Sequence, residues 1–159
     1  MTGIKEKTCC FSGHRRLPAS KIQRIIFNLN QEIDRLIEVG VTTFISGGAV
    51  GFDQMAACLI SSKKEMGYDL KLAMALPCRE QDAAWNEKEK QLYRYLLEQA
   101  DTIKYISDNY SNDCMKKRNQ YMVSQSAFCI CALLHNRSGT GQTVRLAHLA
   151  NCRVINVAR

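Results

Sequence analysis

The chain has 159 residues, the length of one ordinary domain, and its 46% hydrophobic and 23% charged residues are typical of globular proteins. This composition excludes collagen-like, low-complexity and largely disordered chains. The net charge of +7 is uneven, because residues 1–113 hold 15 basic and 15 acidic side chains whereas residues 114–159 hold seven basic ones and no acid. A basic segment predicts a phosphate, a nucleic acid or an acidic surface as partner.

Short apolar runs alternate with longer helical patterns along the chain. Strands are expected at 7–11, 41–45, 70–76, 102–106, 128–134 and 153–157, and helices at 18–40, 52–66, 83–100, 115–126 and 140–150. This alternation predicts an α/β fold, a single Rossmann-like domain over residues 1–159. Its mostly parallel sheet has about six strands and helices on both faces.

The cysteines and the apolar runs bear on location. None of the apolar runs is long enough to span a bilayer, and the N-terminus lacks a signal-peptide pattern. The eight cysteines lack the C-x-x-C spacing of structural zinc sites. We therefore expect reduced thiols packed as small apolar groups, a cytoplasmic protein, no metal site and no membrane partner.

The segment after the second expected strand combines a glycine-rich turn with a helix start. It reads Ser46-Gly47-Gly48-Ala49-Val50-Gly51-Phe52-Asp53. Ligands of parallel sheets bind beyond the carboxyl ends of the strands, and glycine lets the backbone approach a phosphate at a helix N-terminus. The alternative interpretation is a tight turn with Asp53 as a simple helix cap.

A second glycine-rich helix start follows the fifth expected strand. Ser138-Gly139-Thr140-Gly141-Gln142-Thr143 offers hydroxyl donors between Arg137 and Arg145. It lacks the lysine of a P-loop, so an ATPase of that kind is not indicated. Two such turns in one domain favour an anionic ligand.

Basic residues follow two other elements. Ser12-Gly13-His14-Arg15-Arg16 ends the first expected strand and predicts either a phosphate contact or a solvated basic loop. Arg118 and Asn119 lie near the start of a helix and contact a ligand if that start faces the cleft.

Acidic and aromatic residues follow the third expected strand. Glu80 or Asp82 would bind a ribose hydroxyl, act as a base or cap the next helix. Trp85 would either stack on a nucleobase or pack against the core.

Several of these motifs together resemble a known family. Phe11-Ser12-Gly13-His14-Arg15, the stretch 44–53, Arg118-Asn119 and Ser138-Gly139-Thr140 are similar to the YpsA-like branch of the SLOG superfamily, from about Lys7 to the C-terminus. The resemblance implies a Rossmann-like fold that binds nucleotides or nucleotide-derived ligands. The superfamily also includes the Lonely Guy phosphoribohydrolases, molybdenum cofactor carriers and DNA-processing protein A. The glutamate of the phosphoribohydrolase motif has no counterpart in 137–145.

The leading hypothesis is a binding or sensor domain for a small nucleotide-like ligand such as a nucleotide, NAD or ADP-ribose. The expected ligand-binding residues are Gly13, His14, Arg15, Ser46, Gly47, Gly48, Gly51, Asp53, Arg118, Asn119, Ser138, Gly139, Thr140, Gly141 and Thr143. One alternative is an N-glycosidic hydrolase of a nucleoside monophosphate, with Glu80 or Asp53 as its carboxylate. Another is a module for single-stranded nucleic acid. The resemblance also suggests a homo-oligomer.

Overall fold

The apolar runs form strands and the amphipathic segments form helices in the computed structural model, which describes residues 3–159. After a short 3₁₀ helix, η1 (Ile4–Lys7), the strands are β1 (Thr8–Gly13), β2 (Thr43–Ser46), β3 (Lys71–Leu76), β4 (Thr102–Tyr105), β5 (Phe128–Ala132) and β6 (Arg153–Asn156). The helices are α1 (Ala19–Glu38), α2 (Phe52–Glu65), α3 (Glu87–Gln99), α4 (Cys114–Ser124) and α5 (Gly139–Leu149).

The strands pair in the order β4-β3-β2-β1-β5-β6, and all neighbours are parallel. The single α/β domain with a parallel sheet is therefore confirmed. In register, Cys9 of β1 lies opposite Phe44 of β2 on one side and opposite Phe128 of β5 on the other. The chain builds outward from β1 to β4 and then returns to the other side of β1. Such a switch in strand order opens a crevice at the carboxyl ends of the strands, where ligands of α/β proteins bind.

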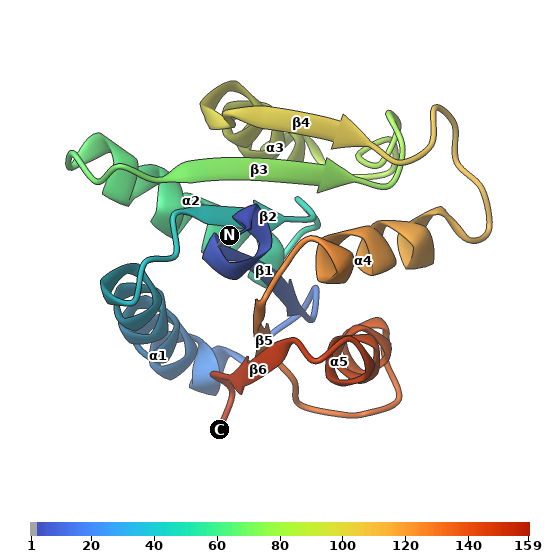
Figure 1. Cartoon of the computed structure of the whole chain (residues 1–159). Helices are drawn as coiled ribbons and strands as arrows, with labels where there is room; N and C mark the ends of the chain where they lie inside the picture. Colours follow the sequence, from blue (N-terminus) through green and yellow to red (C-terminus); the bar gives the residue numbers. More distant parts are fainter. Residues whose placement is uncertain (1–2) are drawn as a thin grey trace.

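Two helical layers cover the sheet. Helices α1, α2 and α3 bury one apolar cluster against it, which includes Phe11, Phe44 and Phe52. Helices α4 and α5 bury a second cluster on the opposite face, which includes Met122 and Val144. Figure 1 shows α1 and α5 on opposite sides of β5 and β6. Because both faces are covered, the central strands carry almost continuous apolar sequence.

The third long helix begins later than the expected start at residue 83. The Asn86 side chain accepts a hydrogen bond from the Glu89 backbone N–H (2.8 Å), and Glu89 Oε1 accepts one from the Asn86 N–H (3.1 Å). This reciprocal capping box satisfies N–H groups that a helix start leaves free, so α3 begins at Glu87. Residues 79–84 form turns instead of helix and carry Gln81 toward the site.

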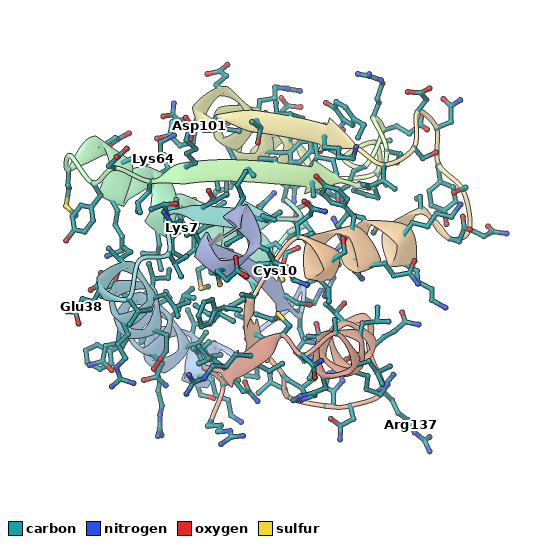
Figure 2. The ribbon with its side chains drawn as sticks, viewed as in Figure 1. Lys7, Cys10, Glu38, Lys64, Asp101 and Arg137 are labelled. Atoms are coloured by element: carbon teal, nitrogen blue, oxygen red, sulfur yellow. The ribbon has the colours of Figure 1, made fainter. Side chains whose placement is uncertain are left out.

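All eight cysteines are free thiols, and all of them except Cys58 are buried. Cys10 lies in the central strand β1, among the side chains of the second apolar cluster (Figure 2). Among residues 3–159, no group of three or more His, Cys, Asp or Glu side chains is arranged to hold a metal ion. None of the helices in this part of the chain combines the length and the apolar character that a bilayer crossing needs.

Candidate functional site

A cavity of about 340 Å³ lies at the switch point, beyond the carboxyl end of β1. Its volume is within the range of small-molecule sites in proteins. Eight of the residues expected to bind a ligand line it: Gly13, His14, Arg15, Asp53, Arg118, Asn119, Gly139 and Thr140. Ser12, Ala49, Gln81, Trp85 and Met115 complete the lining.

The loop after β1 is held against the loop after β2. A Cβ on Gly13 would overlap the Phe52 ring, and a Cβ on Gly51 would overlap the backbone carbonyls of His14 and Arg15. Gly51 also has a φ of +96°, which glycine adopts without strain. The Phe52 N–H donates to the His14 carbonyl (3.2 Å). This close approach of two backbones places His14 and Arg15 at the cavity.

Arg118 forms the buried cationic wall of the site. Its residue exposure is 4%, its Nη1 donates to the Gly47 carbonyl (2.8 Å), and its Nε donates to Asn119 Oδ1 (2.8 Å). Within residues 3–159, the hydrogen-bond partner of Nη2 is the Met115 thioether (3.9 Å), which is a weak acceptor. Arg118 takes part in none of the ion pairs found within residues 3–159. One edge of the guanidinium is therefore available to an anion.

Asp53 supplies a buried carboxyl group to the same cavity. It is 6% exposed, and its Oδ1 has no hydrogen-bond partner within the described residues. Burial raises the pKa of Asp53 to about 6, although the charge of Arg118 and the backbone N–H groups of Ala49 and Gly13 oppose that shift. A buried carboxylate oxygen without a well-formed hydrogen bond is costly, so the Asp53 carboxyl group suits a ligand hydroxyl or amine.

Gln81 is a site residue that the sequence analysis missed. Its Nε2 donates to the Gly47 carbonyl (3.3 Å) and to the Tyr93 hydroxyl (3.2 Å), while its Oε1 is buried and unpartnered. The Gly47 carbonyl thus accepts from both Gln81 and Arg118. In the sequence, Gln81 is marked by its position beyond the third strand, between Glu80 and Asp82.

The N-terminus of α5 forms another wall of the cavity. Ser138 caps it, since its Oγ accepts from the Gly141 N–H (3.0 Å), and Thr143 Oγ1 donates to the Gly139 carbonyl (3.0 Å). These bonds hold the first turn so that Gly139 and Thr140 line the cavity. A helix N-terminus presents free N–H groups and partial positive charge, which favour a phosphate.

The cavity lining does not include the other seven residues expected to touch a ligand: Ser46, Gly47, Gly48, Gly51, Ser138, Gly141 and Thr143. Hydrogen bonds of some of them connect the loops behind the lining. The Ser46 hydroxyl, for example, donates to the Asp53 carbonyl (2.8 Å) and accepts from the Gly48 N–H (3.2 Å).

The two carboxylate candidates differ in position. Glu80 is exposed, and its Oε1 accepts from the Tyr110 backbone N–H (2.6 Å) on a loop outside the cavity lining. Asp53 alone of these two lines the cavity. Trp85 also lines it while its ring packs edge-on against Tyr93, at 5.0 Å between centroids.

Among the seven basic residues of 114–159, the cavity lining includes Arg118 and none of the others. Arg118 lines it, whereas Arg137 and Arg145 are exposed on the loop before α5 and on α5 itself. Arg137 points away from the molecule in Figure 2. The second cation of the cavity, Arg15, comes from the part of the chain whose charges balance.

A model of the YpsA family, described as the YspA SLOG family, matches residues 2–150. The chain belongs to the YspA SLOG family.

This SLOG protein has several bacterial relatives. It is 30% identical over 116 residues to the uncharacterised prophage-derived protein YoqJ of Bacillus subtilis, covering 65% of this chain and 68% of YoqJ. It is 28% identical over 128 residues to a UPF0398 protein of Halalkalibacterium halodurans, covering 79% of this chain and 66% of that protein. With a UPF0398 protein of Bacillus thuringiensis, the match spans about half of the relative (54%) at 29% identity over 62% of this chain.

Two solved structures share the fold of this SLOG domain. Both are DNA processing protein A (DprA), from Streptococcus pneumoniae (TM-score 0.65, 18% identity) and from Helicobacter pylori (TM-score 0.67, 19% identity). Each similarity covers 95% of this chain, but only 50% and 65% of the respective DprA chain. The Helicobacter pylori protein is described as binding single-stranded DNA.

Proposed function

We propose that this SLOG domain binds a nucleotide or nucleotide-derived ligand in the cavity between β1, α2, α4 and α5. One observation carries the proposal: the buried Arg118 and the buried Asp53 line the same cavity, and each has an atom without a strong hydrogen-bond partner among residues 3–159. In a ligand that has a phosphate and sugar hydroxyls, the phosphate oxygens accept hydrogen bonds from Arg118 and the hydroxyls donate to Asp53.

The phosphate would lie between Arg118 Nη2, Arg15 and the first turn of α5. Guanidinium groups and helix N-termini both favour phosphate oxygens. Thr140, which lines the cavity, forms no side-chain hydrogen bond within residues 3–159, so its hydroxyl is a further donor. The ribose would then reach Asp53, and Trp85 offers an aromatic surface to the base.

Calorimetric titration with AMP, ADP-ribose and NAD tests this function. We expect binding by at least one of them, weakened at least tenfold by Arg118→Lys, because lysine keeps the charge but loses the planar fork. Arg153→Lys, on the exposed side of β6, is the matched control and should bind normally. Thr140→Val is a near-isosteric second variant in case Arg118→Lys does not fold. Failure of all three nucleotides to bind at millimolar concentration would reject the proposal.

A hydrolase acting on a nucleoside monophosphate is the second candidate. It is supported by Asp53, whose pKa of about 6 suits proton transfer near neutral pH. Release of free adenine from AMP, abolished by Asp53→Asn, would establish it. If AMP binds but no adenine is released, the hydrolase is rejected and the proposed binding function stands.

Single-stranded nucleic acid is a third candidate, supported by the shared fold with DprA. Phosphate contacts along a strand release counterions, so affinity for an oligonucleotide would fall steeply with salt. Salt-independent binding, or none, would reject this role.

We also propose a cytoplasmic location, which the free thiols support, and cell fractionation tests it.

A further inference from the structure

A second cavity of about 890 Å³ adjoins the first. It shares His14, Arg15 and Trp85 with the first cavity, so these three residues form the boundary between two compartments. Residues lining only the second cavity include Arg16, Glu89 and His135.

The charge of the second compartment is positive. Arg15 and Arg16 are exposed and take part in none of the ion pairs within residues 3–159. The acidic residue that lines it, Glu89, already accepts the Asn86 N–H in the cap of α3. Two arginines against one engaged carboxylate favour an anionic group.

The boundary residues are held in defined positions. The Arg15 guanidinium carbon lies 5.9 Å from the centroid of the Trp85 ring. The rings of His14 and His135 stack with centroids 4.3 Å apart, and His14 Nε2 accepts the Leu134 N–H (3.0 Å). His14 is therefore a neutral ring with its proton on Nδ1, which leaves that N–H as a donor.

We propose that the ligand spans both compartments and is a nucleoside diphosphate whose second phosphate carries a further sugar or nucleoside. This inference rests on the proposed function. The nucleoside monophosphate part occupies the first compartment, Arg15 lies beside the bridge between the two phosphates, and the distal sugar enters the second compartment beside Arg16 and His135. The first cavity has a volume of about 340 Å³, and the second continues from it past the three shared residues.

Titration of AMP and ADP-ribose into the wild type and into Arg16→Ala tests the proposal. ADP-ribose should bind at least tenfold more tightly than AMP. Arg16→Ala should weaken the binding of ADP-ribose at least fivefold and leave the affinity for AMP within twofold of the wild type, because Arg16 lines only the second compartment. His135→Ala should act in the same direction, and Arg153→Ala should change neither affinity.

Each other outcome has a definite meaning. If ADP-ribose binds no more tightly than AMP, the proposal of a ligand that spans two compartments is wrong while the proposed function stands. The same holds if Arg16→Ala weakens the binding of AMP and of ADP-ribose equally. If the dinucleotide pApA binds more tightly than ADP-ribose, the second compartment serves a nucleic-acid strand and the proposal is overturned. If no nucleotide binds, the proposed function itself falls.

Discussion

Asp53 and Arg118 both approach the point that a Cβ on Gly47 would occupy. A Cβ built on Gly47 would be 2.9 Å from Asp53 Oδ2 and 2.5 Å from Arg118 Nη1. The two opposite charges are thus close enough to affect each other's pKa, yet they form none of the ion pairs within residues 3–159. A paired Asp53 and Arg118 would neutralise each other, whereas this arrangement leaves both groups to a ligand.

Gly47→Ala should destabilise the protein by about 2 kcal/mol and weaken ligand binding, because the added methyl group displaces Arg118 or Asp53. Gly139→Ala is the matched control on the opposite wall, since a Cβ there meets nothing within 4 Å. Its free energy of unfolding should stay the same or rise by up to about 1 kcal/mol. Urea unfolding of both variants measures the difference. Equal stability of the two would show that the contact at Gly47 is relieved without cost.

Asp53 should make the protein less stable as the pH rises. Its pKa is about 6 in the folded chain and about 3.9 in an unfolded one, so the folded state binds more protons between these values. Its contribution to the free energy of unfolding should fall by about 1 kcal/mol from pH 5 to pH 7. Asp53→Asn should remove this part of the pH dependence, as seen by urea unfolding at the two pH values. Asp108→Asn, at an exposed position, is the control and should leave this pH dependence of stability unchanged.

The cap of α5 should matter for both stability and binding. Ser138→Ala removes the acceptor for the Gly141 N–H and should cost about 1 kcal/mol of unfolding free energy. It should also weaken nucleotide binding, since Gly139 and Thr140 line the cavity from this turn. Thermal melts and calorimetry measure the two effects. Ser20→Ala, on the exposed first turn of α1, should change neither.

His14 should titrate below the ordinary histidine value of about 6.5. Burial lowers the pKa of His14, and the positive charge of a protonated His135 lowers it further. Because the folded-state pKa is lowered, this residue costs stability as the pH falls below 6.5. Nitrogen-15 NMR should find the proton of the neutral ring on Nδ1, with His14→Gln identifying the signal. His135→Ala should raise the pKa of His14 partway, because burial remains, and an unchanged value would contradict the role of the stacked pair.

The predicted elements agree with the structure where local pattern decides them. The spacing of Ile25, Leu29 and Ile33 predicts a helix, because burial on one face of a helix requires that spacing. The strand before Gly47 is predicted by its β-branched and apolar residues, because a strand covered on both faces is apolar throughout. The start of α3 was missed by four residues, because the Asn86–Glu89 capping box outweighs the weaker helical pattern before it. Nothing local in the sequence showed that residues 79–84 form turns and carry Gln81 toward the cavity.

The sequence by itself determined the order of strands and helices, the coverage of both faces of the sheet and the two glycine-rich turns. These follow from periodicity and backbone preference, which act between near neighbours. Tertiary structure decided which of these residues meet. Arg118 reaches the carbonyl of Gly47, 71 residues earlier, and Gln81 reaches the same atom from another loop. Such contacts depend on β1 lying between β2 and β5, a pairing that no local pattern specifies.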